Sequence, residues 1–279
     1  MSETAVLRNL HFAIGDDVPR YWHGGRKSVT TLFDNLSVFF PAGERFFMQA
    51  VRAHQHHVTD EALKKEGRTF CGQEAVHGRE HERYNAWLLG KGVPVDGLER
   101  HVVAVLRRVT ARTPKRMQLA ATCALEHFTA VMAQMILGDP RNLEGAHPTM
   151  AALWRWHAAE ENEHRAVAYD VYLASGGFYA ERVVVMAAAT LIFWRMVIAH
   201  QRILMRADGT SGSWAEWRAL GHFLFVQPGS FRKLARHYFS YYRPGFHPSD
   251  IECSTLLADW ERELDTSETY AQARETYAA

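Results

Sequence analysis

A helix built from residues 71–81 (CGQEAVHGREH) would carry Glu74, His77 and His81 along one side. These residues are three and four positions apart, and such positions share one face of an α-helix. Carboxylate and imidazole groups are both ligands for divalent transition metals. The stretch therefore predicts part of a metal site.

Residues 156–164 (WHAAEENEH) repeat this arrangement with His157, Glu161 and His164. Each of the two stretches contains one Glu-x-x-His unit. A single unit of this kind is common by chance and usually consists of two solvated helix residues. Two units on separate predicted helices are a much stronger indication of a shared site.

Two further predicted helices each carry one carboxylate among apolar neighbours, Glu44 and Glu126. A glutamate from each of two helices and a Glu-x-x-His unit from each of two others form the ligand set of a di-iron or di-manganese bundle. Four carboxylates can neutralise two divalent cations, and one imidazole on each favours iron or manganese over calcium or magnesium. Burying these carboxylates without cations would be very costly, so the sequence predicts two bound metal ions.

Helical patterning dominates the chain, and no sustained two-residue alternation suggests a sheet. Pro41 predicts a helix start, because proline is tolerated in the first turn. The fold expected is all-α, a four-helix bundle with additional C-terminal helices. The predicted helices are residues 41–57, 60–89, a short one at 98–109, 113–137, 147–175, 179–206, 213–242 and 250–264.

We expect a single domain over residues 1–279, without repeats or low-complexity linkers. The metal-binding bundle would span about residues 41–177, after an N-terminal segment, 1–40, and before a C-terminal helical cap, 178–279. The long connection at residues 91–112 fits the one long crossover of ferritin-like bundles.

The net charge is +1, which gives no electrostatic reason to expect a nucleic-acid partner. Three cysteines without a close-spaced pair favour a reducing compartment, and the N-terminus lacks the features of a signal peptide. The cytoplasm is therefore the expected location. The mixture of basic and aromatic residues at 231–246 favours helix packing or a subunit interface, and the aromatic-rich C-terminal third favours a homodimer.

The apolar run at residues 183–194 is closed by Arg182 and Arg195. Its twelve residues fall short of the roughly 18–20 needed to cross a bilayer, so no transmembrane segment is expected. The run is typical of a buried or subunit-contacting helix, with contact to a lipid surface as the alternative.

With these residues the chain resembles the ferritin-like di-iron carboxylate superfamily. It looks most like a bacterial family labelled "predicted metal-dependent hydrolase". The resemblance rests on four stretches within residues 36–177: LSVFFPAGERFF (36–47), GQEAVHGREHERYN (72–85), EHFTA (126–130) and WRWHAAEENEHRAVAYDVY (154–172).

The array His-x-x-x-Glu-x-x-His also resembles the p-aminobenzoate N-oxygenase group, where the extra histidine is a seventh ligand. By that likeness His157 would join Glu161 and His164 on one metal; a core histidine that only supports a ligand is the alternative. The likeness gives His81 no such role, so it is expected to support the site. In ferritin-like oxygenases the residue before each Glu-x-x-His unit often serves the histidine of the partner helix. Gln73 and Glu160 hold these positions, although Gln73 replaces the usual acidic residue.

Three functions follow from such a site. The first is an enzyme that activates O₂ at two iron ions to oxidise or oxygenate a small apolar substrate, held under the C-terminal helices. The alternative, implied by the family label, is a two-metal hydrolase using zinc, manganese or iron. The third, an iron-handling protein with ferroxidase-like activity, ranks last because the C-terminal helices would be superfluous.

Overall fold

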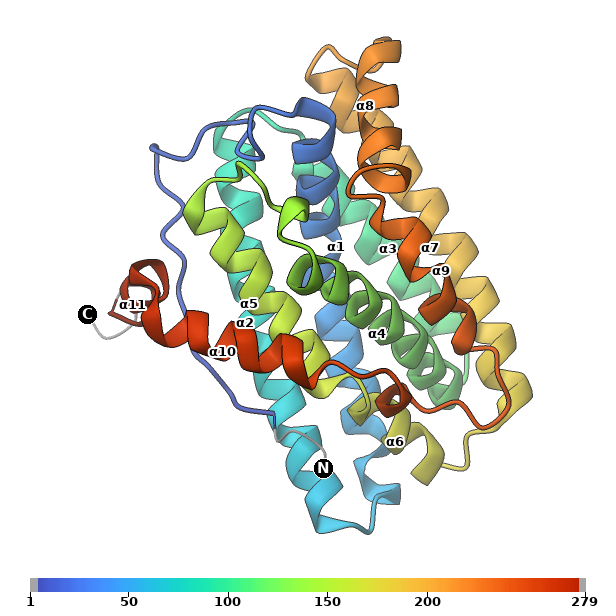
Figure 1. The fold of residues 1–279 in the computed structure, drawn as a ribbon. Helices are drawn as coiled ribbons and strands as arrows, with labels where there is room; N and C mark the ends of the chain where they lie inside the picture. Colours follow the sequence, from blue (N-terminus) through green and yellow to red (C-terminus); the bar gives the residue numbers. More distant parts are fainter. Residues whose placement is uncertain (1–4, 276–279) are drawn as a thin grey trace.

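The computed structural model describes residues 5–275, and the fold is all-α as the sequence predicts (Figure 1). Within these residues no β-strand occurs, and one isolated bridge joins His23 to Ala146. The α-helices are α1 (Lys27–His54), α2 (Glu61–Gly90), α3 (Val95–Arg112), α4 (Lys115–Gly138), α5 (Pro148–His164), α6 (Val167–Ala174), α7 (Tyr179–Ala207), α8 (Trp214–Phe225), α9 (Ser230–Ser240), α10 (Ser254–Thr266) and α11 (Glu268–Glu275). Three 3₁₀ turns lie at Gln55–His57, Pro140–Asn142 and Pro248–Asp250.

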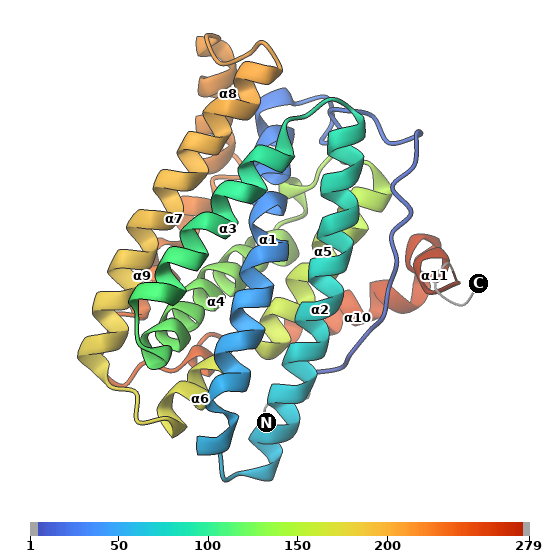
Figure 2. The same ribbon diagram turned by 180° about the vertical axis from the view of Figure 1, so that it is seen from behind.

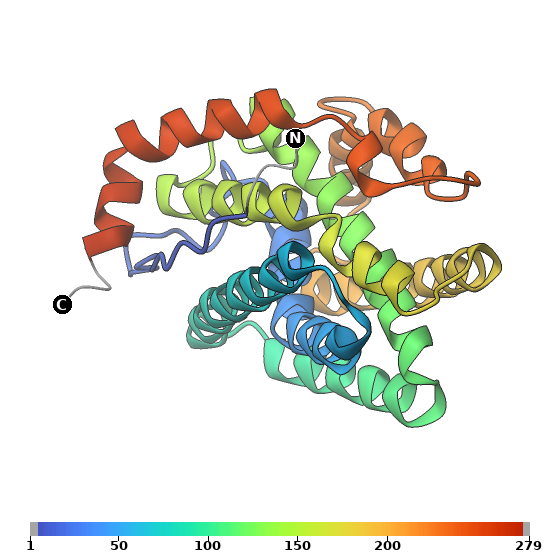
Figure 3. The same ribbon diagram turned by 90° about the horizontal axis from the view of Figure 1, so that it is seen from below.

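The bundle that positions the site consists of α1, α2, α4 and α5. Helix α1 packs against α2 and α4, and α5 packs against α4 and α2. The predicted long crossover is itself helical, and Figure 2 shows this helix, α3, between α1 and α7. Near the C-terminus, α10 lies across the outside of α5 (Figure 3).

The prediction that the first bundle helix begins at Pro41 is wrong, because α1 begins at Lys27 and continues through the proline. Proline lacks the N–H that would bond to the carbonyl four residues earlier. That carbonyl belongs to Ser37, and the side-chain amide of Asn85 on α2 donates to it at 3.3 Å. A neighbouring helix thus satisfies the group that Pro41 leaves without a partner.

Two other predicted helices are each divided in the structure. The one at residues 147–175 is interrupted after His164, where the Arg165 guanidinium donates to the Asn162 carbonyl. The one at residues 213–242 is interrupted between α8 and α9. Pro228 cannot donate a backbone bond there, and Gly229 has a φ of +69°, which favours glycine.

By length and composition, α4 and α7 could each cross a membrane, a test that core helices also pass. In α4 the most apolar 18-residue window is 67% buried within the fold, as in an ordinary core helix. The corresponding window of α7 is only 28% buried. Helix α7 confirms the predicted helix at residues 179–206, but its apolar window is longer than the run at residues 183–194 that the sequence analysis judged too short to cross a bilayer.

A buried polar network fixes the N-terminal segment to the bundle. The Asp34 carboxylate on α1 is fully buried and accepts hydrogen bonds from Arg20 (2.6 Å), Trp22 (3.1 Å) and Tyr84 of α2 (2.6 Å). Hydrogen bonds to a buried charge are stronger than neutral ones. This carboxylate therefore joins three parts of the chain that are distant in sequence.

We predict that Asp34→Ala lowers the free energy of unfolding by roughly 3 kcal/mol, because it leaves buried donors without their acceptor. Chemical denaturation followed by circular dichroism measures the change. The matched control is Asp96→Ala, which removes an exposed carboxylate paired with Arg100 on α3 and should have little effect. Equal losses in the two variants would contradict the role of the Asp34 network.

Candidate metal centre

Four bundle helices each direct one glutamate into the interior: Glu44 from α1, Glu74 from α2, Glu126 from α4 and Glu161 from α5. None of the four side chains is more than 2% exposed. His77 of α2 and His157 and His164 of α5 are buried among them. The structure thus brings together all seven residues that the sequence predicts as metal ligands.

These side chains form two adjacent groups. In one, ligand atoms of Glu44, His77 and His157 lie within 4.8 Å of one another, and in the other the same holds for Glu74, Glu161 and His164. Glu126 adjoins the second group, with its Oε2 3.4 Å from the Nε2 atom of His164.

Glu161 lies between the two groups. Its Oε1 is 3.0 Å from the Nε2 atom of His157, and its Oε2 is 3.7 Å from that of His164. A carboxylate in this position can serve two cations at once.

Many polar atoms of these groups have no hydrogen-bond partner. Buried polar atoms are nearly always paired, so such a concentration of unpaired ones needs an explanation. A pair of cations supplies one, since the unpaired atoms belong to the predicted ligands. They are both carboxylate oxygens of Glu44, Glu74 and Glu126, Oε2 of Glu161, Nδ1 of His77 and Nε2 of His164. The donor set fits two metal ions, and the assignment of each residue as a ligand stays a prediction.

The grouping of His157 differs from the one that the resemblance implied. It shares its group with Glu44 and His77 rather than with His164. Contacts between α2 and α5 show the reason, because His164 lies beside Glu74, whereas His157 lies one α2 turn further on, against His77. The two helices run antiparallel here, so the two ends of the α5 array face different residues of α2.

Glu160 of α5 accepts a hydrogen bond from the Nε2 atom of His77 on α2, at 3.1 Å. That contact leaves the Nδ1 atom of His77 facing the carboxylates. The Trp156 indole also donates to Glu160 at 2.9 Å. The expected cross-helix contact is therefore present, and it orients His77 for metal binding.

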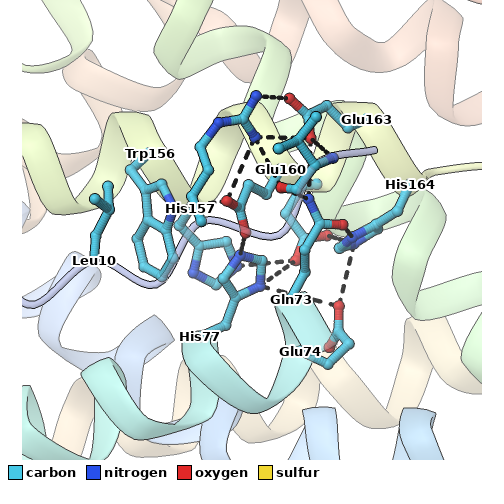
Figure 4. Close-up of polar contacts among 12 residues, drawn as sticks. Leu10, Gln73, Glu74, His77, Trp156, His157, Glu160, Glu163 and His164 are labelled. Atoms are coloured by element: carbon cyan, nitrogen blue, oxygen red, sulfur yellow. Dashed lines mark hydrogen bonds and ion pairs between the residues drawn. The ribbon is translucent and has the colours of Figure 1, made fainter. Parts of the chain in front are cut away.

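Gln73 makes the reciprocal contact, and its Oε1 lies 3.0 Å from the Nδ1 atom of His164 (Figure 4). Its amide nitrogen donates to Glu163 at 3.0 Å, which fixes the direction in which the amide points. Arg8 pairs with Glu163 at 2.8 Å. Glu163 thus provides the acidic group that position 73 lacks, and it acts on His164 through the Gln73 amide. The sequence analysis missed Arg8 and Glu163, because nothing in their spacing links the N-terminal segment to α5.

His81 does not join either group, and it supports His157 through a chain of hydrogen bonds. Asn85 donates from its amide nitrogen to Glu99 (2.8 Å), so its oxygen accepts from the Ser37 hydroxyl (2.7 Å). Ser37 has one proton to donate and must accept from the Nδ1 atom of His81, at 2.9 Å.

The other ring nitrogen of His81 then accepts from the Nδ1 atom of His157, at 2.7 Å. This sequence of donors leaves the Nε2 atom of His157 without a proton, facing Glu161. An unprotonated nitrogen beside a carboxylate oxygen at 3.0 Å is unfavourable unless a proton or a cation lies between them. The network therefore supports His157 as a ligand and His81 as the residue that fixes its tautomer.

Gly78 on α2 lies where Glu44 of α1 approaches most closely. A Cβ atom at this position would lie 2.9 Å from Oε2 of Glu44. A larger residue here would force the Glu44 carboxylate to move from the place it occupies beside His77 and His157. The sequence analysis missed this requirement, because a glycine inside a predicted helix gives no indication of what it faces.

Burial raises the pKa of Glu44, Glu74 and Glu126 well above its ordinary value, and the neighbouring carboxylates raise it further. Burial also lowers the pKa of His77 and of His81, and the nearby His157 adds to that effect. Without metal, Glu44, Glu74 and Glu126 therefore favour the neutral carboxyl form, and His77 and His81 favour the neutral imidazole. Glu161 differs, because the effect of burial is outweighed by the neighbouring His157 and His164, which hold its pKa well below the ordinary value.

Two adjoining apolar cavities lie beside the site. A cavity of about 50 Å³ has His157 and Glu161 in its wall. A larger one of about 240 Å³ adjoins it and is lined by α1, α3, α4 and α7. The two cavities share wall residues Leu36, Phe40, Thr129 and Met132. Helix α7 thus forms part of the wall over the larger cavity, as expected for a C-terminal cap.

An all-α bundle that buries two adjacent groups of carboxylates and histidines has the residue types of a metal site. A family model described as predicted metal-dependent hydrolase matches residues 6–252, and the chain belongs to this family. No curated protein and no solved structure matches the chain significantly. The family description agrees with the predicted enzyme and favours the hydrolase alternative over the oxygen-activating function.

We predict that Gly78→Ala weakens metal binding roughly tenfold or more, because the added methyl group displaces the Glu44 carboxylate. Isothermal titration with Mn²⁺ or Zn²⁺ measures the affinity. Gly90→Ala is the matched control on the same helix, since a Cβ there meets nothing within 4 Å. Unchanged affinity in Gly78→Ala would mean that Glu44 does not hold a metal.

We predict that metal binding releases protons and that the affinity falls as the pH is lowered. The raised pKa of Glu44, Glu74 and Glu126 means that these groups keep protons above the ordinary value of about 4.3 and lose them when a cation binds. His77 has a lowered pKa and releases none. Titration in buffers of different ionisation enthalpy counts the protons. An affinity that does not fall as the pH is lowered toward the ordinary glutamate value of about 4.3 would contradict this sign.

Proposed function

We propose that this protein is a two-metal hydrolase that acts on a substrate with an apolar portion. The observation that carries the proposal is the set of unpaired carboxylate and imidazole atoms, buried next to an apolar cavity system. The family description supports the hydrolytic class. Four carboxylates would balance the charge of two divalent cations, which makes the buried site electrostatically tenable.

The seven predicted ligands would divide between the metals as the two groups indicate. Glu44, His77 and His157 would hold one cation; Glu74, Glu126 and His164 the other; and Glu161 would contact both. When bound, the cations would supply Lewis acidity, which polarises a carbonyl or phosphoryl oxygen and acidifies a water molecule.

The protein's own contribution is orientation and exclusion of water. Glu160 and Gln73 hold His77 and His164 in fixed orientations, and the chain through His81 does so for His157. Phe40 packs against the rings of His81 and His157, with ring centroids at 4.5 and 4.3 Å. The apolar wall of the cavities would take the hydrophobic part of the substrate.

Oxidation of an apolar substrate with O₂ is the second candidate, with iron as the metal. One observation favours it: the walls of the larger cavity are apolar apart from Thr113 and Thr129, so they contain no charged group to bind a polar substrate. An apolar molecule without an ester or amide would fit these walls equally well.

The zinc form and the iron(II) form distinguish these functions. We predict that the zinc protein cleaves p-nitrophenyl esters without O₂, with kcat/KM rising as the acyl chain is lengthened. Inactive zinc protein together with substrate-dependent O₂ consumption by the iron(II) form would favour the oxidase. Growth of a mineral core would favour iron handling and contradict both.

We predict that Glu126→Gln reduces metal binding from two ions per chain to about one and removes the activity. The variant keeps the shape of the side chain and removes one of the four charges that offset the cations. Elemental analysis after dialysis gives the stoichiometry. Glu82→Gln, an exposed glutamate on α2, is the control. If Glu126→Gln still bound two ions with unchanged affinity, the assignment of Glu126 as a ligand would be wrong.

A further inference from the structure

Helix α7 exposes a long apolar stripe to solvent. Val184, Leu191 and Ile198 are seven residues apart, so they share one side of the helix, and each is more than half exposed. The opposite side of α7 packs against α1 and α4. The stripe is therefore the outward side of a helix that belongs to the fold, and α7 runs along one edge of the molecule in Figures 1 and 2.

The stripe continues onto α8 and α9. Ile198 of α7, Phe225 of α8 and Phe239 of α9 line the same open hollow, of about 600 Å³, and both phenylalanines are more than half exposed. We call these five side chains, Val184, Leu191, Ile198, Phe225 and Phe239, the α7–α9 face. Large apolar side chains that gather on one exposed side of a protein are typical of an interaction site.

This part of the chain is also strongly basic. Residues 182–246 contain nine lysines and arginines and two acidic residues, a net charge of +7, whereas the whole chain has +1. Eight of the nine basic residues are exposed. Both acids are used within the fold, because Asp208 pairs with Arg20 and Glu216 accepts from the backbone N–H of Ser28.

The exposed cations lie close to the apolar side chains. Arg195 and Arg202 continue the stripe of α7 at steps of three and four from Leu191 and Ile198. Among the described residues, only Lys233 and Arg243 of the eight exposed cations form ion pairs. The rest are available to bind an anionic partner.

We propose that the α7–α9 face binds an anionic lipid surface. The apolar side chains would enter the boundary between headgroups and acyl chains, and the arginines would bind phosphate groups beside them. A two-fold dimer through this face would bring two surfaces of the same positive charge together, which disfavours a second copy as the occupant. A membrane span is disfavoured because α7 keeps Arg182, His200 and Gln201 buried within the fold.

The α7–α9 face adjoins the larger apolar cavity. Val184 belongs to the face and also lines the 240 Å³ cavity, together with Ile192 on the same exposed side of α7. An apolar substrate dissolved in the bilayer would therefore reach this cavity beside the docked helix. This consequence rests on the proposed function, whereas docking itself does not depend on the metals.

Flotation of the metal-loaded full-length protein with vesicles tests the docking. We expect at least tenfold stronger binding to vesicles of phosphatidylcholine with phosphatidylglycerol than to phosphatidylcholine alone, and weaker binding at high salt. The double variant Arg195→Glu/Arg202→Glu should lose the preference for anionic vesicles. Leu191→Glu/Ile198→Glu should lower binding at least tenfold. Both pairs are exposed, so neither variant should disturb the fold.

Leu89→Glu on α2 is the matched control, since it changes a leucine that is also more than half exposed but lies outside the face, and it should bind as the unaltered protein does. Equal binding to neutral and anionic vesicles, or none to either, would overturn the proposal. Sedimentation tests the remaining alternative, a dimer. If the protein is a dimer that Leu191→Glu/Ile198→Glu dissociates, and if it does not bind vesicles, the face belongs to an interface with a second copy. Esterase activity of the zinc protein in detergent-free buffer reports on the proposed function separately.

Discussion

Four carboxylates buried close together are the constraint on which the rest of this structure depends. An isolated buried carboxylate is so unfavourable that it normally takes up a proton, and here the carboxylates also repel one another. Two divalent cations remove both costs, because their charge equals that of the four groups. The fold is therefore arranged around a centre in which Glu44, Glu74 and Glu126 are stable either protonated or bound to metal.

The surrounding polar groups favour the metal-loaded condition. In His77, His164 and His157, one ring nitrogen is hydrogen-bonded to Glu160, Gln73 and His81, respectively. The other ring nitrogen of each faces the carboxylates. The donors and acceptors in these contacts leave little choice of tautomer, so the ligands are oriented before a metal arrives. This orientation extends to the N-terminal segment, since Arg8 neutralises the Glu163 carboxylate that directs Gln73.

The sequence predicted what depends on local spacing. Helices α2 and α4, the start of α5 and the convergence of the seven predicted ligands follow from helical periodicity and from the chemistry of Glu-x-x-His. What it could not predict depends on contacts between helices. Pro41 lies inside α1 because Asn85 bonds to the carbonyl that proline leaves open. His157 lies beside His77 because α2 and α5 run antiparallel, which no motif in either helix reveals.

The C-terminal helices lie between this buried centre and the outside of the protein. In water, the inner side of such helices is expected to be apolar and the outer side polar. The inner side of α7 lines an apolar cavity, and this cavity adjoins a smaller one that has His157 and Glu161 in its wall. Its outer side is apolar as well, which would be unfavourable in water unless something covers it. A helix that only closed the cavity would be expected to have a polar outer side. The combination of apolar side chains and arginines on that side, above a cavity that accepts apolar molecules, is instead what an enzyme needs to take a hydrophobic substrate from a lipid surface.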